Sequence, residues 1–182
     1  MVIEETTGTS VAAALRAHVL ADPRFSAMAY QPEEQPKGPL ALPFLGGRVR
    51  PNIVEVGGGY LPSKAAGDGS IASDSASLAL WGYLLFGTNL LSERSLLKMT
   101  DFGSRNDYDG YGLGTFDQTN LGEEGFGVEA IGNGGWDPGG YSTILSVLPS
   151  KGIVISVMTN EGGYPPDLVL PVAEKLATSL EG

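Results

Sequence analysis

Residues 131–142 read Ile-Gly-Asn-Gly-Gly-Trp-Asp-Pro-Gly-Gly-Tyr-Ser. This glycine-rich run ends in the turn-forming residues Asp, Pro and Gly, and it predicts a strand that enters a tight turn. The two strand-like segments that follow predict a β-hairpin with an apolar core. Because glycine carries no side chain that blocks approach, the backbone N–H groups of such a strand can face a substrate.

Four short segments after residue 110 are rich in β-branched and aromatic side chains and predict strands. They cover residues 111–117, 126–131, 142–148 and 153–159. Residues 153–158 are almost continuously apolar, which is typical of a strand covered on both faces. Residues 149–152, Pro-Ser-Lys-Gly, predict the turn between the last two strands.

Helical periodicity and capping residues predict helices elsewhere in the chain. They cover residues 11–20, residues 75–86 after a cap at Ser73 or Asp74, a short stretch that ends at Met99, and residues 167–180. The last helix carries an apolar stripe that we expect to face the sheet. The stripe consists of Leu168, Val172, Leu176 and Leu180.

Helices followed by an antiparallel meander and a closing helix predict an α+β fold, in which helices flank an antiparallel sheet. We expect residues 1–182 to form a single domain. Its expected parts are a helical region at 1–29, a long loop rich in Pro and Gly at 30–64, a second helical region at 65–100, and the sheet with its closing helix at 101–182.

Composition narrows the classes of function. Eleven Lys and Arg side chains against 21 Asp and Glu give a net charge of −10, which argues against a nucleic-acid partner because phosphate binding needs clustered cations. With no cysteine and one histidine, His18, the chain has little material for a Ser-His-Asp triad or a metal site. We therefore expect no metal and no cofactor. No apolar run reaches the length of about 18 residues that a membrane helix needs.

Three stretches, taken in their order and spacing, resemble a known family. They are residues 2–10, residues 65–73 with the following helix and residues 90–92, and the strand residues 111–114, 133–135 and 157–160. The first resembles the segment after a Tyr-x-Asn motif, the second an Ala-Gly-Gly-x-x-Ser-Thr segment, and the third the closing sheet. The chain is thus similar to the C-terminal portion of the β-lactamase-related serine hydrolases, which include class C β-lactamases, D-alanyl-D-alanine carboxypeptidases and esterases. The resemblance implies one partial domain, the C-terminal part of a penicillin-binding-protein-like transpeptidase fold.

The resemblance also implies roles for the glycine-rich strand. In the family, the serine of a Ser-x-x-Lys motif attacks a carbonyl group, and a Lys/His-Thr/Ser-Gly strand lines the opposite wall. Asn133, Gly134 and Gly135 occupy that strand here, and the Trp136 N–H is the candidate oxyanion donor. Asn133 has no cationic form, so a neutral ester or amide suits the site better than a substrate with a carboxylate. The alternative interpretation makes Asn133 a turn residue that tolerates positive φ.

Aromatic residues are further candidates for substrate binding. Trp136, Tyr141 and Tyr111, together with Asn133, are expected to contact a small ester, amide or peptide. The alternative interpretation treats these aromatics as ordinary core and turn residues.

The chain lacks an obvious nucleophile motif. Residues 95–98 fit Ser-x-x-Lys and residues 104–106 fit Ser-x-Asn, but both lie at the wrong place in the family's order, and no Tyr-x-Asn occurs. We expect the nucleophile and the base upstream of Met1, on an N-terminal half that is missing here or on a partner subunit. The isolated chain is then expected to be inactive. It should expose an apolar seam and an open sheet edge that promote pairing or self-association.

Two interpretations of function follow. The first is the C-terminal half of a serine acyl hydrolase that works through an acyl-enzyme. The second is a non-catalytic, β-lactamase-like module that binds a ligand in the same cleft. The family is often exported, but this chain shows no basic n-region of a secretory signal, so localisation is not predicted.

Overall fold

The computed structural model describes residues 2–31, 33–50, 69–103, 110–122, 125–137, 140–162 and 168–180. The helices are α1 (Val2–Thr7), α2 (Val11–His18), η1 (Pro23–Phe25), α4 (Ser75–Gly87), α5 (Glu93–Met99), η2 (Pro149–Lys151) and α7 (Leu170–Ser179). The strands are β1 (Ala29–Tyr30), β2 (Phe44–Leu45), β3 (Arg48–Val49), β4 (Ile71–Ala72), β5 (Phe116–Asp117), β6 (Ile131–Asp137), β7 (Tyr141–Leu148) and β8 (Ile153–Thr159).

The main sheet is antiparallel, with the strand order β5-β6-β7-β8. Strands β6 and β7 pair from Ile131↔Val147 to Asp137↔Tyr141 as one long hairpin. The β7 and β8 strands follow the predicted segments closely, and Gly152 takes the left-handed conformation in the turn between them, with φ 64°.

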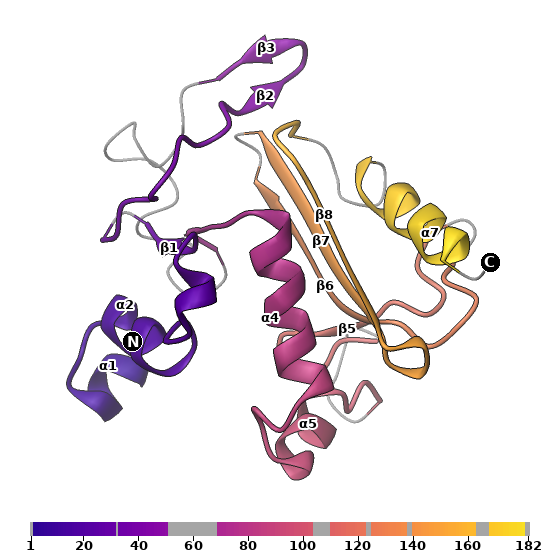
Figure 1. Cartoon of the computed structure of the whole chain (residues 1–182), viewed down its shortest axis with the longest axis horizontal. Helices are drawn as coiled ribbons and strands as arrows, with labels where there is room; N and C mark the ends of the chain where they lie inside the picture. The colour runs from indigo at the N-terminus through magenta and orange to yellow at the C-terminus, as the bar shows by residue number, and fades with distance from the viewer. Residues whose placement is uncertain are drawn as a thin grey trace.

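Helices cover both faces of this sheet, with α4 on one face and α7 on the other (Figure 1). On the α7 face, Ile144 packs with Leu170 in the largest core cluster. On the α4 face, a Cβ atom at Gly82 would come within 2.9 Å of Leu145 Cδ1 and 3.0 Å of Val154 Cγ1. The glycine therefore lets α4 approach the sheet closely, and the predicted α+β fold is confirmed.

The α4 helix is apolar on every side but only partly covered. Its N-cap is Asp74, whose Oδ1 accepts a 2.7 Å hydrogen bond from the Ser77 N–H. Besides the sheet, α4 packs against residues 19–28, where Phe25 meets Trp81 edge to face. Four of its apolar side chains are nevertheless half-buried: Leu78, Leu80, Trp81 and Leu84. A helix that is apolar all round is typical of a protein interior.

The strand predicted at 126–131 is wrong. In the structure β6 begins only at Ile131, and residues 126–130 form no strand. Gly125 and Gly127 have φ values of 66° and 67°, and such left-handed residues bend the chain out of the extended conformation. The side chains of Phe126 and Ala130 are buried in the α7-side core instead.

The strand predicted at 111–117 shrinks to the two residues of β5. Gly114 has a φ of 70°, and the Gly112 N–H donates to the Thr115 carbonyl oxygen at 2.8 Å. This turn interrupts the extended chain. Tyr111 still forms an isolated bridge to Phe116 across the turn.

The region predicted as a loop at 30–64 contains a small hairpin. Strands β2 and β3 pair around Gly46 and Gly47, which both have positive φ as a two-residue hairpin turn requires. The Phe44 N–H donates to the Asn160 carbonyl oxygen at 2.7 Å, which joins this hairpin to the end of β8. Residues 51–64 lie outside the described residues.

The stripe predicted to seat α7 on the sheet is largely wrong. Leu168 packs against the core, but Val172, Leu176 and Leu180 are 45%, 43% and 59% exposed. The face that meets the sheet instead carries Val169, Leu170, Ala173 and Ala177. Ala173 and Ala177 let this face of α7 approach the sheet closely, and a second apolar stripe remains outside.

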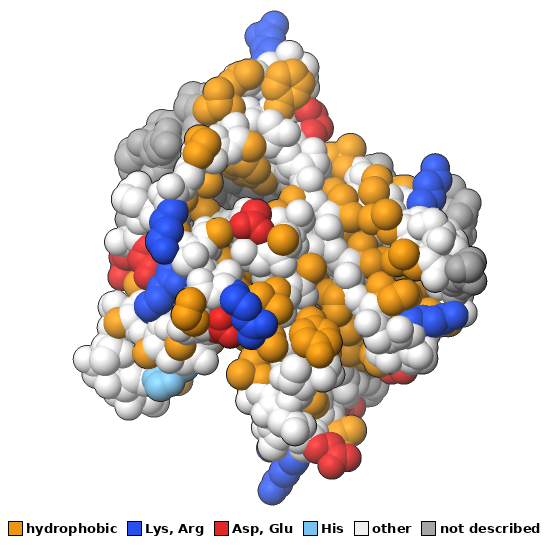
Figure 2. Space-filling model, in the orientation of Figure 1, with side chains coloured by type: hydrophobic (Ala, Val, Ile, Leu, Met, Phe, Trp, Pro, Cys, Tyr) orange, Lys and Arg blue, Asp and Glu red, His pale blue; other side chains and the backbone are white. Residues whose placement is uncertain are grey.

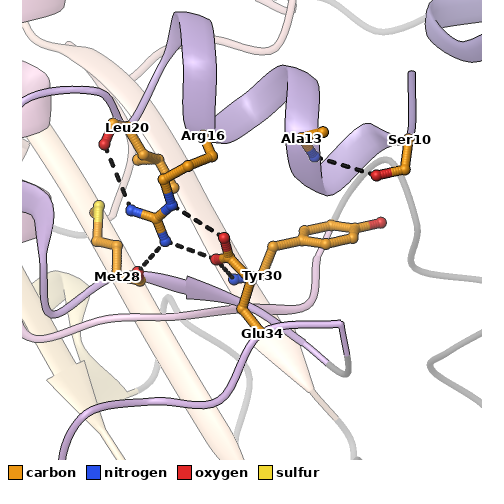
Figure 3. Close-up of polar contacts among 7 residues, drawn as sticks. All are labelled: Ser10, Ala13, Arg16, Leu20, Met28, Tyr30 and Glu34. Atoms are coloured by element: carbon orange, nitrogen blue, oxygen red, sulfur yellow. Dashed lines mark hydrogen bonds and ion pairs between the residues drawn. The ribbon is translucent and has the colours of Figure 1, made fainter. Parts of the chain in front are cut away.

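An ion-pair network holds the N-terminal region together (Figure 3). The Arg16 guanidinium donates to both carboxylate oxygens of Glu34, at 3.0 and 2.6 Å, and to the Met28 carbonyl oxygen at 2.8 Å. Glu34 also accepts a 2.9 Å hydrogen bond from the Tyr30 N–H. The hydrogen bonds from Arg16 hold the pKa of Glu34 below its ordinary value of 4.5.

Glu34→Gln is expected to lower the free energy of unfolding by about 1 kcal/mol at pH 7, because it weakens a charge-assisted pair that is only partly buried. Since the folded-state pKa of Glu34 lies below its unfolded value, its stabilisation is present above about pH 4.5 and is lost as the pH falls through the folded-state pKa. Urea unfolding from pH 7 to pH 3 measures this difference. Glu33→Gln is the matched control, and an equal loss with both variants would contradict the role of the network.

Candidate active site

The glycine-rich strand β6 runs beyond its neighbour β5. Strand β5 pairs only with Ile131 and Gly132. In the described part of the chain, residues 133–137 pair with β7 alone, so the other edge of this stretch carries no strand. Gly134, Gly135 and Trp136 are exposed, Trp136 by 53%. An open antiparallel edge presents backbone N–H and C=O groups at alternate residues, so another molecule can reach it.

The pairing register places the side chains of this strand on two faces. Asn133 and Gly135 pair with Leu145 and Thr143, and Leu145 points toward α4. Trp136 pairs with Ser142 and belongs to the opposite face. The structure therefore does not bring the Asn133 and Trp136 side chains together.

Asn133 lies within β6, and its φ is not positive. The interpretation as a left-handed turn residue is therefore wrong. Its side-chain Nδ2 donates to the Gly114 carbonyl oxygen at 2.9 Å. This bond ties the turn at residues 112–115 to the strand. The same turn is anchored to α5, because Thr115 Oγ1 donates to the Met99 carbonyl oxygen at 2.8 Å. No local pattern in the sequence indicates this contact of Asn133.

Tyr111 lies beside the Asn133 end of the strand. Its ring packs against Phe116, with centroids 4.3 Å apart and planes at 60°, and Phe116 pairs with Gly132. The two residues are 37% and 38% exposed. They form an aromatic shelf next to the open edge, on which an apolar group can stack.

Tyr141 lies at the other end of the strand. It pairs with Asp137, four residues beyond Asn133, which corresponds to about 13 Å along an extended strand. Its hydroxyl donates to the Ala41 carbonyl oxygen at 2.6 Å. Tyr141 therefore anchors the segment that leads into β2, and it does not share a position with Tyr111.

Residues 41–45 close this end of the site, although the sequence predicts a loop there. Asn160 Nδ2 donates to the Leu42 carbonyl oxygen at 2.7 Å. At Gly140, with a φ of 130°, a Cβ atom would come within 2.7 Å of the Phe44 nitrogen. Only glycine fits here without strain, so the β6–β7 turn and the β2 segment pack directly backbone on backbone.

Comparisons with known proteins show the family of the chain and its fold. A family model described as Beta-lactamase matches residues 1–178. The chain belongs to the beta-lactamase family. Among solved structures, its fold is similar to that of a D-stereospecific amidohydrolase from a Streptomyces species, with a TM-score of 0.64 and 23% identity over 89% of this chain and 48% of that one. This chain thus spans about half the length of the solved structure. A search of the curated proteins finds no match.

Membership of the beta-lactamase family confirms the resemblance stated from the sequence. The family resemblance makes Ser-x-x-Lys the expected nucleophile motif, and residues 95–98 of α5 fit this pattern. Ser95 Oγ lies 2.9 Å from Ser92 Oγ, and Ser92 caps the helix by accepting from the Ser95 N–H. Lys98 is exposed. The described contacts of Ser95 are thus those of a capping pair, whereas a nucleophile needs a base within hydrogen-bond reach. Residues 104–106 lie outside the described residues.

The described residues contain neither a metal cluster nor a membrane-spanning helix. Across them, no three His, Asp or Glu side chains gather where they could hold a metal ion. Nor does any helix among them have both the length and the apolar character to cross a membrane.

Proposed function

We propose that this chain supplies the oxyanion strand of a serine acyl hydrolase, and that the serine nucleophile and its base come from an N-terminal half or a partner subunit. The observation that carries the proposal is the glycine-lined edge of residues 133–135, which pairs with β7 alone in the described part of a chain of the beta-lactamase family. The likeness to about half of a solved amidohydrolase supports it.

The proposed chemistry is acyl transfer in two steps. The serine hydroxyl gives its proton to the base and attacks the carbonyl carbon, and the carbonyl oxygen becomes an oxyanion. The Trp136 N–H donates to that oxyanion, which is worth on the order of 3 kcal/mol of barrier per donor. The leaving group departs with the proton, and water then hydrolyses the acyl-enzyme. Gly134 and Gly135 keep the approach to this edge clear.

A neutral ester, amide or peptide bond is the proposed substrate class. Asn133 carries no charge to bind a carboxylate, and one of its N–H groups is already used by Gly114. The aromatic shelf of Tyr111 and Phe116 lies at the β5 end of the same edge, where Phe116 pairs with Gly132 and so shares the sheet face of the Trp136 indole, opposite Asn133.

The α4 helix indicates where the nucleophile-bearing polypeptide lies. The helix is apolar on all sides. It lies on the sheet face toward which the Asn133 side chain points. Its outer side chains are only half-buried. Polypeptide that covers this side of α4 can place a nucleophile near the open edge of β6.

The exposed aromatic shelf also favours the second candidate, a non-catalytic module that binds a ligand by stacking. The two candidates differ in turnover. We would combine the purified chain with the polypeptide encoded beside it and assay a chromogenic ester and nitrocefin. The hydrolase predicts turnover only in the combination. Ligand binding with no turnover in the combination would reject the hydrolase and favour the module.

A further inference from the structure

Strand β6 directs the backbone groups of alternate residues toward its outer edge. The Gln118 N–H donates to the Ala130 carbonyl oxygen at 2.8 Å, on the β5 side of the strand. This direction repeats at every second residue of an antiparallel strand, and the register of β6 with β7 is unbroken from residue 131 onward. The N–H and C=O groups of Gly132, Gly134 and Trp136 therefore point the same way. Because β5 ends opposite Gly132, those of Trp136 face the edge that a substrate approaches.

An aromatic surface lies on one face of the sheet at this edge. Trp136 is 53% exposed, and its ring lies on the same sheet face as Phe116, which pairs with Gly132. Residues 132 and 136 are about 13 Å apart along an extended strand. Between them, Gly134 is exposed and carries no side chain. We call Trp136, Gly134 and the aromatic shelf of Tyr111 and Phe116 the indole face.

We propose that the indole ring of Trp136 determines which acyl group binds, by packing against the aromatic side chain of an L-configured acyl residue, an inference that rests on the proposed function. When the Trp136 N–H binds the acyl carbonyl oxygen, the Trp136 carbonyl oxygen faces the same edge and accepts the N–H of that acyl residue. The two residues then form a hydrogen-bonded antiparallel pair, whose side chains lie on one sheet face with Cβ atoms about 4.5–5.5 Å apart. An L-residue thereby places its side chain against the indole ring, whereas a D-residue directs it away.

The composition of the indole face favours an aromatic, uncharged side chain. Residues 111–116 and 131–136 contain no Lys, Arg, Asp or Glu, so these stretches offer no ion-pair partner to a charged group. Aromatic rings pack favourably edge to face or offset, and cross-strand aromatic pairs stabilise antiparallel strands. Figure 2 also shows hydrophobic side chains over the region of β8 and α7. Strand β7 separates β8 from β6, so those side chains lie away from the edge that binds the carbonyl group.

Binding to the purified chain tests the proposal without hydrolysis. The probes are N-acetyl-L-phenylalanine amide, its D-enantiomer and N-acetylglycine amide, titrated into the ¹⁵N-labelled chain while the indole N–H signals are followed by NMR. The chain has two tryptophans, Trp81 and Trp136, and Trp136→Phe identifies the signal of Trp136. We expect the L-probe to shift this signal and not that of Trp81, with a Kd at least about fivefold lower than those of the other two probes. Equal Kd values, tighter binding of the D-enantiomer, or no shift at Trp136 would overturn the proposal.

Turnover in the combination with the nucleophile-bearing polypeptide provides a second readout. We compare kcat/KM for the p-nitrophenyl esters of N-acetyl-L-phenylalanine and N-acetylglycine. Their ratio is expected to fall about tenfold in Trp136→Ala, mainly through a higher KM for the phenylalanine ester, and to stay within about threefold in Trp136→Phe, which keeps an aromatic ring. An unchanged ratio in Trp136→Ala would reject the indole ring as the determinant. If the L-probe binds at Trp136 but the combination hydrolyses neither ester, the binding site stands and the proposed function fails.

Discussion

Gly132→Ala is expected to lower the free energy of unfolding by about 3 kcal/mol or more, among the largest losses for a single substitution in this chain. A Cβ atom at residue 132 would overlap the carbonyl oxygen of Leu145 on the neighbouring strand and lie 3.0 Å from Gln118 Oε1. Gln118 is buried and donates to the same Leu145 oxygen at 3.3 Å. Strands β6 and β7 can accept the methyl group only by moving apart, which disrupts the centre of the sheet.

The matched control lies three residues away in the same strand. At Gly135 a Cβ atom would meet only the Thr143 hydroxyl oxygen, at 2.7 Å, and that side chain can rotate. Gly135→Ala is therefore expected to cost less than about 1 kcal/mol. Urea unfolding of both variants measures the difference. If both variants lose the same free energy of unfolding, the close contact of Gly132 with β7 is not the reason that residue 132 must be glycine.

Trp136→Pro is expected to reduce kcat about 10²- to 10³-fold in the enzyme assembled with its nucleophile-bearing part. Proline has no N–H, and loss of one oxyanion donor has this effect in acyl-transfer enzymes. Circular dichroism and urea unfolding check that the variant still folds.

Trp136→Phe separates the backbone from the indole ring. It keeps the N–H and a large aromatic group, and the ring belongs to the sheet face opposite Asn133. We expect kcat to change less than about tenfold. A similar loss of kcat in both variants would mean that the side chain, and not the N–H, makes the important contact.

The sequence predicts those elements that depend on local patterns. The apolar runs of β7 and β8, the turn at Gly152 and the cap at Asp74 each depend on neighbouring residues, and the structure agrees with them. Positive φ at Gly125 and Gly127 cannot be read from composition, so residues 126–130 are wrongly predicted as a strand. The two stripes of α7 are both apolar, and only packing against the sheet decides which is buried.

For the candidate site, the strand was predictable and its surroundings were not. The glycines of β6 indicate a backbone that other groups approach, and the structure finds an open edge there. The contacts of Asn133 with Gly114 and of Tyr141 with Ala41 join residues that lie 19 and 100 positions apart. No local pattern indicates such pairs, because tertiary packing alone brings them together.

We propose that this chain carries the oxyanion strand and not the nucleophile. The intact mass of the purified chain after incubation with a serine-reactive fluorophosphonate, beside Ser95→Ala and a known serine hydrolase as a reagent control, tests this proposal. We expect no adduct on the chain. An adduct that disappears in Ser95→Ala would contradict it and make Ser95 and Lys98 the nucleophile motif.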